Sequence, residues 1–173
     1  MNKKTISKLI TVAMVLILIG LFFYVKNQNT VPECIEGDCQ NGIGTLIFDD
    51  GRRYAGSFRE GYYDGQGTLT IADGRQYVGS WEKDLPSGQG VQTNPDGTKY
   101  EGEWKDGNYH GHGVLTLPGG GVYEGGWFED KPHGNGTYTH PDGRKYVGQY
   151  SKGVAEQGVL IMPDGTEKVI NSL

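Results

Sequence analysis

A 23-residue repeat runs from Tyr54 towards the end of the chain and limits what the chain can fold into. Tyrosine recurs five times at this spacing, with glycine two residues later and an aromatic residue four residues later. The tyrosines are Tyr54, Tyr77, Tyr100, Tyr123 and Tyr146, and the aromatic residues are Phe58, Trp81, Trp104, Trp127 and Tyr150. Each unit continues with glycines and ends in Asp-Gly or an equivalent. Because a unit of 23 residues is too short to bury a core alone, the repeat predicts an array of units that pack on their neighbours.

The units at the two ends depart from this pattern. Counting back 23 residues from Tyr54 places a degenerate first unit at Val31, where valine replaces tyrosine. The last unit is one residue short, with Gln157 and Gly158 where the first glycine of the Gly-x-Gly pair is expected. Terminal repeats are usually atypical because one of their faces meets water. The sequence therefore predicts six units, which begin near residues 31, 54, 77, 100, 123 and 146.

Each unit predicts two β-strands. In Tyr-x-Gly-x-Trp the three named residues lie two apart and share one face of a strand. In the second half of a unit, Leu69 and Ile71 share a face with the Gly65/Gly67 pair. The Asp-Gly pairs predict type I′ turns, and residues 83–87 predict a longer loop. The predicted fold is all-β, an elongated twisted antiparallel sheet of consecutive hairpins, whose twelve strands would span about 58 Å.

The repeat Y-x-G-x-W-x-x-G-x-x-x-G-x-G-x-x-x-x-x-D-G resembles the MORN repeat family (membrane occupation and recognition nexus). Residues 100–120 give a close instance, YEGEWKDGNYHGHGVLTLPGG. The resemblance covers about residues 31–173. It implies consecutive β-hairpins in a grooved, elongated sheet with binding and scaffolding roles: tethering of complexes, self-association and, in some members, contact with lipid.

Residues 9–25 predict a transmembrane helix ahead of the repeats. This segment has no charged residue and would span about 25 Å as a helix, close to the thickness of a bilayer core. Lys8 and Lys26 flank it and can reach the interface. Lys3, Lys4 and Lys8 favour a cytoplasmic N-terminus. The alternative is a cleaved signal peptide, but the segment lacks small residues before a cleavage site.

The predicted organisation therefore has four parts. They are a cytoplasmic N-terminus at 1–8, a transmembrane signal anchor at 9–25, a linker at 26–30 and the repeat domain at 31–173. The repeat domain would be exported. Most familiar members of the resembled family are cytoplasmic. An exported member behind a signal anchor suggests a bacterial envelope protein with its repeats on the periplasmic side.

The repeat body is acidic. All 21 acidic residues follow residue 31, against twelve basic residues, which leaves the body with a net charge of −9. An acidic body repels phosphate backbones, so nucleic acid is not expected as a partner, and it disfavours anionic lipid head groups.

Two cysteines, Cys34 and Cys39, lie five residues apart in the degenerate first unit. If the compartment is oxidising, a disulfide between them would close this cap, which lacks the aromatic packing of the other units. Two free thiols and a metal or redox role remain as alternatives, although the chain has no Cys-x-x-Cys motif.

No catalytic motif appears in the sequence, so we expect no enzyme, no cofactor and no small-molecule substrate. His110 and His133 occupy equivalent positions in adjacent units, about two strand spacings or 10 Å apart. That separation is too long for one zinc ion to bridge, so no metal site is expected.

The aromatic stripe is the candidate partner-binding face, although the same rings could serve only as packing. It comprises Tyr54, Phe58, Tyr77, Trp81, Tyr100, Trp104, Tyr123, Trp127 and Tyr146. Gln92 and Asn94 form a polar notch within it, where Leu or Ile is expected. The predicted function is a membrane-anchored scaffold that binds other proteins in the cell envelope, or a second copy of itself through unpaired end strands. The alternative is a glycan-binding or cell-wall-binding module, in which the exposed rings would stack on sugars.

Overall fold

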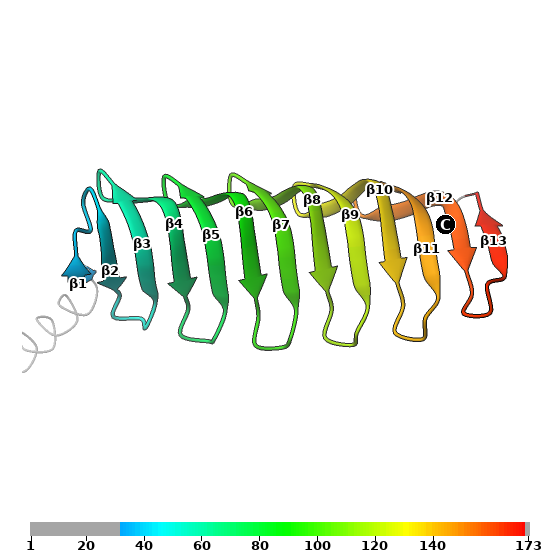
Figure 1. The fold of residues 1–173 in the computed structure, drawn as a ribbon, viewed down its shortest axis with the longest axis horizontal. Coiled ribbons are helices and arrows are strands. Elements are labelled where there is room, and N and C mark those ends of the chain that lie inside the picture. Colours follow the sequence, from blue (N-terminus) through cyan, green and yellow to red (C-terminus); the bar gives the residue numbers. More distant parts are fainter. Residues whose placement is uncertain (1–31, 172–173) are drawn as a thin grey trace, which may run out of the picture. The chain divides into compact units, whose positions relative to one another are not determined.

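The computed structural model describes residues 32–171 and shows one antiparallel sheet of 13 strands (Figure 1). The strands are β1 (Glu33–Gly37), β2 (Ile43–Ile47), β3 (Arg53–Arg59), β4 (Tyr62–Thr70), β5 (Gln76–Glu82), β6 (Leu85–Thr93), β7 (Lys99–Lys105), β8 (Asn108–Thr116), β9 (Val122–Phe128), β10 (Lys131–Thr139), β11 (Lys145–Ser151), β12 (Val154–Ile161) and β13 (Glu167–Ile170). Each strand pairs only with its neighbours in sequence order, which confirms the array of hairpins. Twelve strands were predicted, and the thirteenth is β13, which follows the last Asp-Gly turn and forms the final edge.

The predicted N-terminal segments lie outside the described residues. These are the 1–8 terminus, the 9–25 anchor, the 26–30 linker and the flanking Lys8 and Lys26. Between residues 32 and 171, the structure contains no helix that could cross a membrane.

The Asp-Gly turns are not the type I′ turns that the sequence predicted. The amide of Gly51 donates to the carbonyl oxygen of Phe48 at 3.0 Å, and the amide of Phe48 donates to the carbonyl oxygen of Arg52 at 2.9 Å. In the Asp50-Gly51 pair only Gly51 has a positive φ, of 85°. This is a type I turn closed by a left-handed glycine. The Asp50 carboxylate accepts a hydrogen bond of 3.0 Å from the amide of Arg52, which explains why an aspartate precedes the glycine in this turn.

The longer loop predicted at 83–87 is wrong. Strand β5 ends at Glu82 and β6 begins at Leu85, so the turn has only two residues, Lys83 and Asp84. Their φ angles of 48° and 68° are both positive, which is the signature of a type I′ turn. The equivalent turns lie at 60–61, 106–107, 129–130 and 152–153, and both residues of each also have positive φ.

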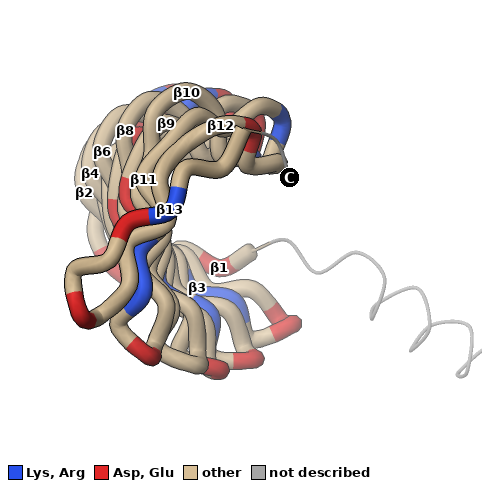
Figure 2. Tube along the Cα trace, turned by 90° about the vertical axis from the view of Figure 1, so that its right-hand side faces the viewer, with Lys and Arg blue, Asp and Glu red and all other residues tan. Residues whose placement is uncertain are grey.

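A bulge in each long strand accompanies the bending of the sheet into an open curl (Figure 2). Between β5 and β6 the pairing moves from Gly79 opposite Gly90 to Trp81 opposite Pro86, so β6 carries two extra residues. Four of the long strands contain a left-handed glycine at the bulge, namely Gly65, Gly88, Gly111 and Gly134. Strand β12 has only one extra residue there. The residue missing from the last unit is therefore a residue of its bulge.

A row of paired glycines crosses the sheet from β2 to β12 and supports the tyrosine rings. Its members are Gly44, Gly56, Gly67, Gly79, Gly90, Gly102, Gly113, Gly125, Gly136, Gly148 and Gly158. A Cβ atom added at Gly102 would lie 2.5 Å from the Cα of Gly113 and 2.9 Å from the hydroxyl of Tyr100. Only glycine leaves room for a ring this close to the backbone.

The aromatic rings form a core one layer thick. The ring of Tyr100 meets Trp104 of its own unit and Trp127 of the next unit edge to face, each at 5.3 Å between centroids. Such contacts repeat along the sheet and join neighbouring units. Because these rings are buried although the sheet has no second layer, we place them on the inner side of the curl.

Candidate functional site

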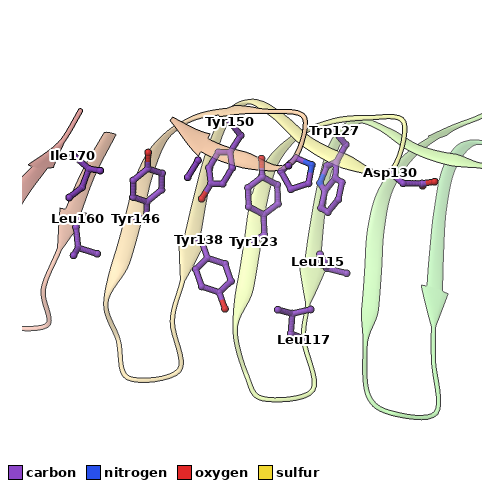
Figure 3. A pocket seen from close by; sticks show the side chains of 13 residues that line it. Leu115, Leu117, Tyr123, Trp127, Asp130, Tyr138, Tyr146, Tyr150, Leu160 and Ile170 are labelled. Carbon is purple, nitrogen blue, oxygen red and sulfur yellow. The ribbon is translucent and has the colours of Figure 1, made fainter. Parts of the chain in front are cut away.

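The inner side of the curl forms a groove that contains two pockets. The C-terminal pocket has a volume of about 570 Å³ (Figure 3). Its walls are Leu115, Leu117, Tyr123, Trp127, Asp130, Pro132, Tyr138, Tyr146, Tyr150, Gly153, Ala155, Leu160 and Ile170. Both ends of β10 contribute, through Pro132 and Tyr138, so the curl encloses the pocket from two sides. The N-terminal pocket measures about 250 Å³ and is lined by Leu69, Ile71, Arg75, Gln76, Tyr77, Trp81, Asp84, Pro86, Gln92, Trp104 and Gly107.

The nine aromatic residues of the predicted partner-binding face are all buried, and each is at most 8% exposed. Six of them border a pocket: Tyr77, Trp81, Trp104, Tyr123, Trp127 and Tyr146. The other three, Tyr54, Phe58 and Tyr100, border neither. Much of the accessible groove surface therefore comes from residues outside the predicted set, such as Leu117, Tyr138 and Leu160, which are half-buried.

A second layer of rings covers the groove in alternate units. Tyr63 stacks on Tyr54, and Tyr109 stacks on Tyr100, with ring centroids 3.7 Å apart in both pairs. Both covered tyrosines are 0% exposed. The equivalent position in the units between is proline, at 86 and 132. Proline leaves Tyr77 and Tyr123 without a stacked ring, and the two pockets lie over these units.

Backbone hydrogen bonding follows the same alternation. The amide of Tyr63 donates to Asp84 Oδ1 at 2.7 Å, and the amide of Tyr109 donates to Asp130 Oδ1 at 2.8 Å. Proline has no N–H to donate, and in its units the residue equivalent to the aspartate is Gly107 or Gly153. From residue 54 to residue 145 the structure therefore repeats every 46 residues, and the separation of 21 residues between Tyr63 and Asp84, repeated at Tyr109 and Asp130, was its signal in the sequence. The unit that begins at Tyr146 departs from this repeat, with Ala155 at the position of Tyr63 and Tyr109.

Four of the five repeat tyrosines form the same hydrogen bond, and Tyr146 is the exception. Tyr54, Tyr77, Tyr100 and Tyr123 each donate to the carbonyl oxygen three residues later at 2.9–3.0 Å. Burial raises the pKa of Tyr77 and Tyr123 to about 12, so these hydroxyls stay protonated. The buried hydroxyl of Tyr146, which borders the C-terminal pocket, has no hydrogen-bond partner among the described residues.

Gln92 and Asn94, the predicted polar notch, are joined by a hydrogen bond of 3.1 Å from Gln92 Nε2 to Asn94 Oδ1. Gln92 lines the N-terminal pocket. The structure thus places one residue of the notch, Gln92, in a pocket, whereas Asn94 lines neither of the two.

The predicted disulfide between Cys34 and Cys39 is confirmed, and it closes the first unit with its Cα atoms 6.0 Å apart. Cys39 is buried and belongs to the hydrophobic core. The bond therefore ties the exposed strand β1 to the end of the aromatic core.

His110 and His133 lie on either side of Phe128, with ring centroids 5.4 and 5.9 Å from it. Within the described part of the chain, no group of three or more His, Cys, Asp or Glu residues is arranged to hold a metal ion.

Comparison with solved structures finds distant similarity. The TCP domain of SAS-4 from Drosophila melanogaster, solved with a proline-rich motif of Ana2, is 11% identical, and the match covers 82% of this chain and 90% of that chain with a TM-score of 0.48. The TCP10 domain of CPAP from Danio rerio, solved with a peptide of STIL, is 16% identical and covers 80% and 67% with a TM-score of 0.40. At these scores neither structure bears on the function of this chain.

Sequence comparison gives a direct assignment. No curated protein sequence matches the chain. The family model described as MORN repeat matches five times, at residues 54–74, 77–99, 100–122, 123–143 and 146–167. These matches begin at the five tyrosines of the repeat and cover more than half of the chain, which belongs to the MORN repeat family.

Proposed function

We propose that this protein is a non-catalytic scaffold that holds a partner protein by binding a segment of it in the inner groove. The observation that carries the proposal is the C-terminal pocket, an opening of about 570 Å³ walled almost entirely by apolar side chains. Apolar surface of this extent on a soluble domain usually marks an interaction site. MORN repeats serve as binding modules, which agrees with this role.

The N-terminal segment would hold the scaffold at a membrane. The argument rests on the sequence of residues 9–25, an uncharged apolar run flanked by Lys8 and Lys26. Three lysines before the run favour a cytoplasmic N-terminus and an exported repeat domain. The Cys34–Cys39 disulfide is compatible with export, because such bonds persist in oxidising compartments.

The glycan-binding alternative receives no support from the groove. A sugar would need the open face of an aromatic ring on which to stack. Trp81, Trp104 and Trp127 are only 5–6% exposed and pack edge to face with tyrosines.

Crosslinking of the full-length chain in its native membrane, followed by mass spectrometry, tests the scaffold. Leu117→Glu places a charge in the C-terminal pocket, whereas Thr116→Glu, a matched control, places it on the opposite face of the sheet. We expect the first variant to lose crosslinked partners that the second retains. Equal recovery from both variants would contradict groove binding, and an N-terminus that begins near residue 26 to 31 would contradict the membrane anchor.

A further inference from the structure

The two pockets of the inner groove are copies of one another. Nine residues that line the N-terminal pocket have a counterpart 46 residues later that lines the C-terminal pocket. Tyr77 corresponds to Tyr123, Pro86 to Pro132, and Ile71 to Leu117. The unit between them carries Tyr109 stacked over the floor of the groove, and the unit before the N-terminal pocket carries Tyr63 in the same way, so these two units offer no equivalent opening.

The separation of the pockets follows from the pairing of the sheet. Tyr77 lies on β5 and Tyr123 on β9, four strands apart in an uninterrupted sheet. At about 4.8 Å per strand the equivalent walls are roughly 19 Å apart. An extended polypeptide advances about 3.3 Å per residue, so roughly six residues span this distance. Side chains six residues apart lie on the same side of an extended chain and can enter both pockets.

The pockets differ in ways that would orient a bound segment. The C-terminal pocket has Tyr138 where the N-terminal pocket has Gln92, and it is more than twice as large, at about 570 Å³ against 250 Å³. A large apolar group suits this pocket. A smaller group suits the N-terminal pocket.

The charge of the repeat body indicates which residues should surround, in the partner, the two side chains that enter the pockets. The repeat body carries a net charge of −9, and each pocket is bordered by an aspartate, Asp84 or Asp130. Neither carboxylate forms an ion pair within residues 32–171, whereas Arg75, also beside the N-terminal pocket, is paired with Asp73 at 2.8 Å. A basic segment would therefore be favoured over an acidic one.

We propose that the inner groove is a two-point binding site for an extended, basic segment of another protein, with two apolar side chains six residues apart, one seated in each pocket. This inference rests on the proposed scaffold function and specifies which segment the scaffold recognises. The second anchor enters at high effective concentration once the first is bound, so two anchors at the matching spacing gain far more affinity than either alone.

The test uses labelled synthetic peptides of serine and lysine that contain one leucine, or two leucines separated by three to nine positions. Binding to the full-length chain in lipid nanodiscs is followed by fluorescence anisotropy. We expect the tightest binding at a separation of six, at least tenfold tighter than the single-leucine peptide. Affinity that does not depend on the separation, or no binding at millimolar peptide, would overturn the proposal.

Variants assign the two anchors. Ile71→Glu and Leu117→Glu should each lower the affinity of the six-position peptide to that of the single-leucine peptide. Thr70→Glu and Thr116→Glu, on the outer face, should change it less than twofold. The spacing series on the unaltered protein needs no variant, so a variant that fails to fold leaves the test intact. A crosslinked partner that Leu117→Glu releases but that lacks such a side-chain pair would refute the two-point site and leave the scaffold function standing.

Discussion

Tyr109 lies flat on Tyr100, with ring centroids 3.7 Å apart and ring planes 6° apart, and its amide donates to Asp130 at 2.8 Å. The equivalent residue in the next unit, Pro132, can form neither contact and is followed 21 residues later by glycine. One position therefore controls two features at once. The residue at this position determines whether a second ring covers the groove. It also determines whether a backbone amide is present that needs a side-chain acceptor from the following turn.

A double-mutant cycle tests this coupling. Tyr109→Pro reproduces the local sequence of the neighbouring units and removes the amide that donates a hydrogen bond to Asp130. Asp130→Gly alone leaves the Tyr109 amide without its acceptor. We expect the double variant to lose about 1 kcal/mol less unfolding free energy than the sum of the losses in the two single variants. Urea unfolding measures all three. The control pairs Tyr109→Pro with Asp84→Gly, which belongs to another unit, and additive effects in the Asp130 cycle would count against the coupling.

The positions of the glycine row should tolerate no residue other than glycine. A Cβ at Gly102 would lie 2.5 Å from the Cα of Gly113 and 2.6 Å from the carbonyl oxygen of His112, which are backbone atoms that cannot swing away. We expect Gly102→Ala to cost about 3 kcal/mol of unfolding free energy.

The matched control is Gly119→Ala, because that site has ordinary φ and no atom within 4 Å of an added Cβ. We expect it to change stability by no more than about 0.5 kcal/mol. Thermal unfolding of the two variants side by side makes the comparison, and a similar loss in both would show that the row has no special packing role.

The unpartnered hydroxyl of Tyr146 leads to an asymmetry between conservative changes. Tyr100→Phe removes a hydrogen bond of 2.9 Å to the carbonyl oxygen of Glu103, which we expect to cost about 1 kcal/mol. Tyr146→Phe removes a buried hydroxyl that has no partner among the described residues, so it should leave stability unchanged or raised. Denaturant midpoints of both variants test this, and equal destabilisation would mean that Tyr146 also donates in the free protein.

The sequence was sufficient for the strands and their faces, because both follow from alternation over a few residues. The sequence places Tyr54 on the same face of its strand as Phe58, and Leu69 on the same face as Gly67; in the structure Tyr54 and Leu69 are directly paired across β3 and β4. The rings stay buried, however, because the strands bend over them, and the bends accompany bulges such as the one between Gly79 and Trp81. Alternation alone does not reveal a bulge, so the sequence could not decide between the two roles that it allowed for the aromatic stripe, partner binding and packing.

The turns and pockets were missed for a different reason. The sequence of residues 83–87 predicts a loop, but Lys83 and Asp84 adopt positive φ and leave Pro86 within a strand. The pockets depend on a repeat of two units, and a search for the 23-residue period treats Tyr63 and Pro86 as ordinary variation. Their effect on the groove appears only when rings from adjacent strands are placed over one another.

The core tyrosines should make the fold sensitive to alkali. Burial raises the pKa of Tyr77 and Tyr123 to about 12, above the value near 10 of an unfolded tyrosine. Between these values the unfolded chain releases protons that the folded chain retains, so stability is complete below pH 10 and falls as the pH rises from 10 towards 12. We expect the urea midpoint to be lower at pH 11 than at pH 9, and the drop should be smaller in Tyr77→Phe when each variant is compared with itself. Tyrosinate absorbance at 295 nm in the native protein provides the second measurement, since full ionisation near pH 10 without unfolding would contradict a buried, protonated core.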